Sequence, residues 1–120
     1  KNVEGMFGVS DPFFELSRSV ETPSGQSWHP VFRSGHAKDT LSPVWNEIIV
    51  SLDRLVQGMN DIPFLIKLYD HERSGNHTPM GSVEVTVDQI IANEASFELS
   101  LDGKVGNHGF VIVNYAEILA

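Results

Sequence analysis

The chain contains no cysteine and no long apolar run. Without cysteine it has neither a disulfide framework nor a thiolate metal site, which fits a reducing compartment. No stretch of about 18 apolar residues is present, so we predict no membrane-spanning helix. The segment from Lys1 to Gly5 also lacks the apolar core of a signal peptide.

Cations are scarce, with 8 Lys and Arg against 16 Asp and Glu, for a net charge of −8. Nucleic-acid binding needs clustered cations that displace phosphate counterions, and no window of this sequence has them. The same shortage of cations argues against binding to an anionic membrane through a polybasic face alone. The surplus acid fits either a group of cation-binding carboxylates or ordinary solubility, and both interpretations stay open.

Patterns that carry catalysis are missing as well. There is no Gly-x-Ser-x-Gly elbow, phosphate loop or Gly-x-Gly-x-x-Gly fingerprint. His71-Glu72 followed by His77 does not have the spacing of a zinc-protease helix. We therefore expect no enzyme and no small-molecule substrate.

The length of 120 residues, 41% of them apolar, is enough for one domain with a single core. We expect residues 1–120 to form one domain. Since the sequence begins with Lys, we also expect it to be a piece of a longer protein.

Alternation of apolar and polar residues with a period of two dominates the chain and predicts β-strands. Phe13 to Ser19 shows the pattern weakly, with both faces apolar near its start. The other predicted strands have these residues on their apolar faces: Val44, Ile48, Val50 and Leu52; Phe64, Ile66 and Leu68; Val83, Val85 and Val87; Phe97, Leu99 and Leu101; Phe110 and Ile112. Glu15, Glu84 and Glu98 are predicted to lie on outward, solvated faces.

Turn residues separate these runs. Thr22-Pro23-Ser24-Gly25 predicts a hairpin, and polar loops are expected at 74–76 and 102–107. Two short helices are expected, one capped by Asp53 before 54–57 and one capped by Asp88 before 89–92. Together these elements predict an all-β, antiparallel Greek-key β-sandwich.

Three collinear motifs specify the family more closely: Ser10-Asp11-Pro12, then 43–47 (Pro-Val-Trp-Asn-Glu), then 68–72 (Leu-Tyr-Asp-His-Glu) running on to Met80-Gly81. Over nearly the whole chain, from about Gly8 to Ile118, their order and spacing resemble a C2 domain, most of all those of the copines. The resemblance implies a β-sandwich that docks on phospholipid membranes, often with calcium. It also implies that Trp45 packs at the edge of the sandwich.

In C2 domains five loop aspartates hold calcium, and the resemblance carries this pattern over only in part. Asp11 and Asp70 match it, and Glu72 replaces a third aspartate with a longer carboxylate. The other two positions are Gly5 and Thr78, although Glu4 is adjacent to the first. With two carboxylates lost, we expect calcium to bind weakly, at roughly 10⁻⁴ to 10⁻³ M, or not at all. The alternative is that Asp11 and Asp70 only cap loops.

The resemblance also implies residues that meet the membrane. Met6 and Phe7, bracketed by glycines, would insert between headgroups, or else Phe7 would fold back over the sandwich. Arg73 and His77 would meet phosphate, or form an ordinary solvated surface. A thin basic patch would lie on the concave face, in the strand after the first hairpin, where the sequence has His29, Arg33, His36 and Lys38, or else these are ordinary solvent-facing strand residues.

C2 domains resembling this one have eight strands, and the first precedes the Ser-Asp-Pro loop. Residues 1–9 are predicted to be loop, so we expect that strand to be missing from this chain. Its loss would open two unpaired backbone edges, so we expect the strand to be supplied by residues before Lys1 or, alternatively, by a partner, a tag or a swapped strand. The function expected is peripheral docking on phospholipid by a cytoplasmic protein. The alternative is a calcium-independent C2 domain that contacts another protein.

Overall fold

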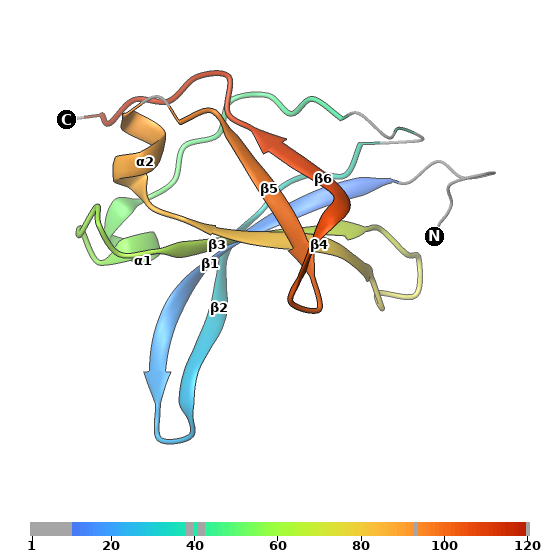
Figure 1. Cartoon of the computed structure of the whole chain (residues 1–120), viewed down its shortest axis with the longest axis horizontal. Helices are drawn as coiled ribbons and strands as arrows, with labels where there is room; N and C mark the ends of the chain where they lie inside the picture. The colour runs from blue at the N-terminus through green and yellow to red at the C-terminus, as the bar shows by residue number, and fades with distance from the viewer. Residues whose placement is uncertain (1–10, 38–39, 41–42, 93, 120) are drawn as a thin grey trace.

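The computed structural model describes residues 11–37, 40, 43–92 and 94–119. Six strands and two short helices follow one another along these residues (Figure 1). Their bounds are β1 Pro12–Thr22, β2 Gly25–Arg33, α1 Leu52–Val56, β3 Phe64–Asp70, β4 Thr78–Val85, α2 Val87–Ile91, β5 Ser96–Leu101 and β6 Lys104–Ile112.

The strands are hydrogen-bonded in the order β2-β1-β3-β4-β5-β6, and every neighbouring pair is antiparallel. A single residue pair, Ser82 with Ser100, joins β4 to β5. At this weak link the sheet bends, and β5 and β6 cross over β3 and β4 in Figure 1. The predicted antiparallel β-sandwich is therefore confirmed, with β2-β1-β3-β4 as one layer and β5-β6 in the other.

Gly81 permits the close approach of the two layers. Its φ is +147°, and a Cβ atom at this position would lie 3.0 Å from the Cβ of Leu99 on β5. Any side chain would therefore be strained and crowded at this position. The Met80-Gly81 motif thus has a structural explanation at the crossing.

The core lies between the layers and is closed by both helices. It includes residues from β1, β3, β4 and β5, which confirms the predicted inward faces of β3 and β5. The buried members are Leu16, Leu55, Val56, Phe64, Ile66, Val85, Val87 and Phe97. Leu99 on β5 is also buried, next to Gly81.

Residues 43–51 are not a strand, so the strand predicted from Val44 to Leu52 is wrong. Val44 and Ile49 are each 82% exposed, and Leu52 begins α1 instead. Alternation marks a strand only where a neighbouring strand supplies backbone partners. No strand among the described residues pairs with this segment.

The face predicted for β6 is also wrong. Phe110 and Ile112 lie on a strand as expected, but they are 59% and 64% exposed. Val111 and Val113 pack against the core in their place. Gly106 and Gly109 both have positive φ, and the pairing with β5 shifts between Glu98 and Ser100. An irregularity of this kind reverses the faces of the residues beyond it.

The helices form where they were predicted but begin earlier. Ser51, not Asp53, caps α1 through its hydroxyl, which accepts the Arg54 N–H at 3.3 Å. Thr86, not Asp88, caps α2 and forms a reciprocal capping box with Gln89. Val87, predicted on the strand, therefore belongs to α2. Neither helix among the described residues is long and apolar enough to cross a membrane.

Candidate functional site at the loop end of the sheet

The start of β1 and the end of β3 meet at one end of the molecule, on the right in Figure 1. Pro12 pairs with Asp70 across the two strands. The backbone N–H of Asp11 donates to Oδ1 of Asp70 at 2.9 Å, and the His71 N–H donates to the Asp11 carbonyl at 3.0 Å. The two predicted ligand loops are therefore joined directly by hydrogen bonds.

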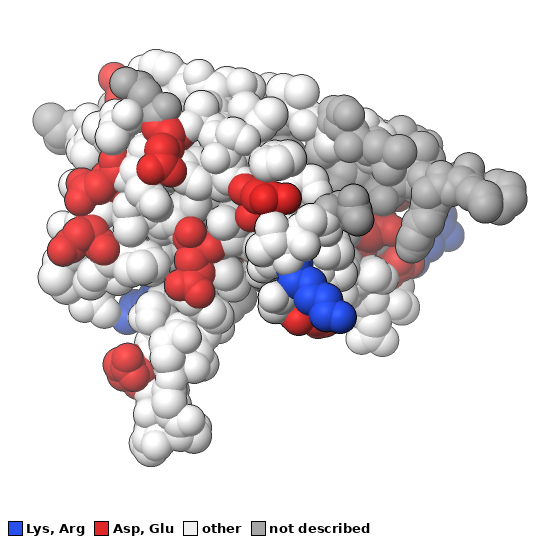
Figure 2. Space-filling model, viewed as in Figure 1, with Lys and Arg blue, Asp and Glu red and all other residues white. Residues whose placement is uncertain are grey.

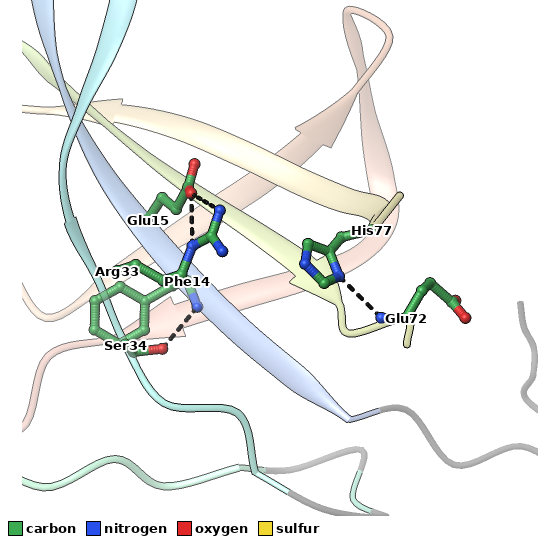
Figure 3. A network of polar contacts seen from close by, with 6 residues as sticks. All are labelled: Phe14, Glu15, Arg33, Ser34, Glu72 and His77. Carbon is green, nitrogen blue, oxygen red and sulfur yellow. Dashed lines mark hydrogen bonds and ion pairs between the residues drawn. The ribbon is translucent and has the colours of Figure 1, made fainter. Parts of the chain in front are cut away.

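The β3–β4 loop, residues 71–77, is closed by contacts of its own. The Glu72 N–H donates to Nδ1 of His77 at 2.9 Å (Figure 3). The Thr78 hydroxyl donates to Oε2 of Glu72 at 3.3 Å. Gly75 donates its N–H to the Glu72 carbonyl at 3.0 Å, which completes a turn at the loop tip. Glu72 is thus the residue around which this loop is organised.

Three imidazoles stack beside this loop. The ring centroids of His36 and His71 are 4.1 Å apart, and those of His71 and His77 are 4.8 Å apart. Partial burial, followed by repulsion from His36 and His77, lowers the pKa of His71 below its ordinary value, while Asp11 and Glu72 oppose this shift. The stack is therefore most favourable when His71 is neutral.

Phe13 is a buried residue of β1 that packs against the β3–β4 loop. It is 2% exposed, although it lies on the face of β1 opposite the core residue Leu16. Its ring stacks on Tyr69 at 5.2 Å and meets the edge of His77 at 4.9 Å, and the Arg33 guanidinium lies 5.0 Å from its centroid. A second, smaller apolar cluster therefore covers the outer face of the sheet at this end.

Glu15 lies on the same outer face, and the prediction that it is solvated is wrong. It is 7% exposed, and Oε2 accepts hydrogen bonds from Nε and Nη2 of Arg33 at 2.9 and 2.7 Å (Figure 3). This ion pair explains how a carboxylate can be buried here. It also means that Arg33, one of the two permanently charged residues of the predicted basic patch, is already paired within the protein.

The predicted calcium ligands do not form a metal-binding group by themselves among the described residues. Asp11, Asp70 and Glu72 lie at the same end, but among the described residues no three His, Asp or Glu side chains converge in a way that could hold a metal ion. One oxygen of Asp70 accepts the Asp11 N–H, and one of Glu72 accepts the Thr78 hydroxyl. Their role as calcium ligands stays a prediction.

The predicted membrane contacts are placed unequally. Met6 and Phe7, like Gly5, lie outside the described residues. Arg73 is exposed at the tip of the loop, whereas His77 is half-buried against Phe13. Arg73 is therefore the better placed of the two to meet a phosphate.

The basic patch is weak in the structure. His29 is exposed on β2 and His36 belongs to the imidazole stack, while Lys38 lies outside the described residues. Figure 2 shows acidic side chains over the α1–α2 end and few cations on that face.

Trp45 packs on β1, which is an inner strand of the sheet, so its predicted place at the edge of the sandwich stays a prediction. Its ring meets that of Phe14 edge-on at 5.0 Å, and its indole N–H donates to the Gly35 carbonyl at 3.0 Å. Trp45 therefore connects Phe14 on β1 with Gly35, which follows β2.

The packing of Phe13 under the β3–β4 loop and the stacking of His36 on His71 were not predicted from the sequence. The one available signal was that both faces of β1 are apolar near its start. A second apolar face on a strand indicates a cover on that side as well, here supplied by the β3–β4 loop. The meeting of His36 with His71 depends on tertiary structure alone.

Comparison with known proteins agrees with this architecture. The family model for the C2 domain matches residues 1–101. Protein BONZAI 1 of Arabidopsis thaliana is 30% identical over 87 residues, which cover 71% of this chain and 14% of that protein. Copine-C of Dictyostelium discoideum is 27% identical over 101 residues, which cover 84% of this chain and 18% of that protein.

Among solved structures, BON1-C2B superposes with a TM-score of 0.78 at 23% identity, covering 98% of this chain and 84% of that one. The chain spans less than a fifth of the length of the two curated relatives. C2 domains are generally non-catalytic modules that interact with lipids or proteins, and commonly bind calcium. The matched family model and the fold together establish that this chain belongs to the C2 domain family and is of the copine and BONZAI type.

Proposed function

We propose that this domain docks a larger, cytoplasmic protein on phospholipid surfaces through its loop end. The observation that carries the proposal is the direct joining of the two loops by the Asp11–Asp70 hydrogen bond, between residues 59 positions apart. This hydrogen bond and the packing of the His77 ring against Phe13 together hold the tip of the β3–β4 loop, where Arg73 is exposed, in a defined position. A surface held in this way loses little conformational entropy when it binds.

The charge of the chain limits how it can bind. At a net charge of −8, attraction to anionic lipid is not the main driving force. We infer that Met6 and Phe7 supply it by insertion, worth roughly 1.5–3 kcal/mol for each buried side chain. Arg73 and His77 add contacts with headgroup phosphate.

Calcium has a small part in this proposal. Because Asp11, Asp70 and Glu72 do not converge on one point, docking is proposed to depend on contacts of the protein itself with lipid. We expect calcium to add to it only weakly, in the range of roughly 10⁻⁴ to 10⁻³ M.

A second candidate function is calcium-independent contact with a protein, and β6 favours it. This strand is at the end of the sheet order, and Val105, Phe110 and Ile112 on it are 66%, 59% and 64% exposed. A strand edge with exposed apolar side chains can accept a further strand from a partner.

One pair of variants separates the two candidates. Phe7→Ser removes a ring that is proposed to insert into lipid, whereas Phe110→Ser removes a ring that is 59% exposed on β6. Each is tested by co-sedimentation with vesicles of phosphatidylcholine and phosphatidylserine. Phospholipid docking predicts that Phe7→Ser lowers vesicle affinity at least tenfold and that Phe110→Ser does not. Equal loss in both variants, or no vesicle binding by the parent protein even with several millimolar calcium, would contradict the proposal.

A further inference from the structure

Thr78 is an exposed hydroxyl residue at the loop end that the docking proposal does not use. It is the first residue of β4, pairs with Asp70 across the strands, and is followed by Pro79. Its hydroxyl makes a long hydrogen bond of 3.3 Å, to Glu72. An exposed Thr-Pro step in extended backbone is the kind of segment that proline-directed serine/threonine kinases accept.

The chain has two other dipeptides of this kind, Thr22-Pro23 and Ser42-Pro43. Thr22 is a poorer acceptor, because its hydroxyl donates to the Gly25 carbonyl at 2.6 Å inside the hairpin turn and its side chain is half-buried. Ser42 lies outside the described residues. Of the two acceptors that the structure describes, Thr78 is therefore the more accessible.

We propose that Thr78 is a phosphorylation site and that its phosphorylation weakens docking on phospholipid. In this reaction the Thr78 Oγ1 attacks the γ-phosphorus of ATP. A P–O ester bond forms, the bond from phosphorus to the ADP oxygen breaks, and the hydroxyl proton passes to the base of the kinase. The regulatory part of this inference rests on the proposed function.

The local charges determine the direction of the effect. Phosphothreonine carries about −1.5 to −2 charges at neutral pH and has lost the hydroxyl donor. The bond to Oε2 of Glu72 is then replaced by repulsion, since both groups are anionic. Asp70 lies directly across the strand pair, so the new charge enters an end that is already acidic.

Two consequences follow from this placement. Each unit of negative charge beside an anionic leaflet lowers affinity by roughly fivefold, so the modified domain should bind such vesicles at least about tenfold more weakly. Because this is a screened interaction, the difference should shrink as salt is raised. The loop around Glu72 should also change without any lipid, because the 3.3 Å bond is lost.

The test uses the full chain with Thr22→Ala and Ser42→Ala, which leaves one Thr-Pro acceptor. The protein is treated with a proline-directed kinase and ATP, and the modified residue is located by mass spectrometry. Thr78→Val, which keeps the β-branched shape without the hydroxyl, is the matched control. Amide shifts of residues 70–79 and sedimentation with phosphatidylserine-containing vesicles are then compared before and after treatment.

We expect phosphate on Thr78, none in the Thr78→Val protein, shifted amides near Glu72, and at least tenfold weaker vesicle binding. Failure of the kinase to modify Thr78 overturns the site. Modification with unchanged vesicle affinity, in a protein that binds vesicles beforehand, overturns the regulation while leaving the proposed function intact. A protein that never binds vesicles overturns the proposed function and the regulation together, whereas the site itself is still decided by mass spectrometry.

Discussion

Replacing Phe13 by alanine should both destabilise the protein and release its loop end. Phe13 is 2% exposed and lies against Tyr69, His77 and the Arg33 guanidinium at 5.2, 4.9 and 5.0 Å. Truncating a buried Phe costs about 3–5 kcal/mol, which includes about 0.5–1.5 kcal/mol for each aromatic pair. Since a domain of this size is stable by only about 5–15 kcal/mol, the loss is a large fraction of the total.

The assay is urea unfolding, combined with amide hydrogen exchange of residues 71–78. The matched control is Phe110→Ala, which removes the same ring from a strand where it is 59% exposed. Most of that ring is already in water, so the control should cost no more than about 1 kcal/mol. If Phe13→Ala does not fold, Phe13→Leu keeps most of the volume and should cost about 1–1.5 kcal/mol.

Hydrogen exchange in the β3–β4 loop distinguishes a specific role of Phe13 in holding this loop from a general loss of core packing. His77 rests on Phe13, and Nδ1 of His77 accepts the Glu72 N–H, so losing the ring should increase exchange at Glu72 more than in β5. Anchoring of the loop by Phe13 is contradicted if Phe13→Ala costs no more than Phe110→Ala, or if exchange in the loop is unchanged in Phe13→Leu.

Three further predictions concern stability. Arg33→Met should cost about 1–2 kcal/mol in urea unfolding, because it leaves the buried Glu15 carboxylate without its partner. This value is discounted for solvent screening, since the Arg33 side chain is 58% exposed even though the Glu15 side chain is only 9% exposed. Lys104→Met, on an exposed residue, should stay within about 0.5 kcal/mol, and an equal cost in both would contradict the buried pair. Thr86→Ala should lower the free energy of unfolding by about 1 kcal/mol in thermal or urea unfolding, because the α2 capping box is lost. Thr86→Ser keeps a hydroxyl and should retain most of this stability, and a Ser variant as unstable as the Ala variant would argue against the cap. Folding lowers the pKa of His71 below its ordinary 6.5, so as the pH falls the unfolded chain protonates this imidazole before the folded protein does. The contribution of neutral His71 to the free energy of unfolding is therefore fully present above pH 6.5 and declines as the pH falls through the folded pKa. Unfolding free energies measured from pH 7.5 to 5 should therefore fall less steeply for His71→Asn than for the parent, and parallel slopes would show the stack to be irrelevant.

The sequence predicted the fold well where alternation coincided with strand pairing. Phe64 and Ile66 on β3, and Phe97 and Leu99 on β5, are buried as expected. Each of these strands has a hydrogen-bonded neighbour on both sides. Under these conditions the inward face follows from the period of two alone.

The wrong predictions concern segments that have no strand partner among the described residues, or an irregular one. Ile49 belongs to an alternating run, but no described strand lies beside it, and it is 82% exposed. Phe110 follows two positive-φ glycines, which reverse the face expected from its position in the run. Neither the missing neighbour nor the irregularity can be found by counting residues along one segment.

The candidate site was predictable in outline only. The motifs placed Asp11 and Asp70 at the same end, where the structure joins them by a 2.9 Å hydrogen bond. Their spacing could not show that this oxygen binds a backbone N–H, or that Glu15 is buried on Arg33. Such contacts depend on side-chain directions, which the order of residues does not specify.

The most direct test of the account is a titration of the isotope-labelled protein with anionic bicelles, without calcium, followed by amide chemical shifts. Docking at the loop end predicts saturable shifts at Asp11 and across residues 71–78, with little change in β6. Shifts confined to β6, or no shift with or without several millimolar calcium, would contradict phospholipid docking at this end and favour a protein partner.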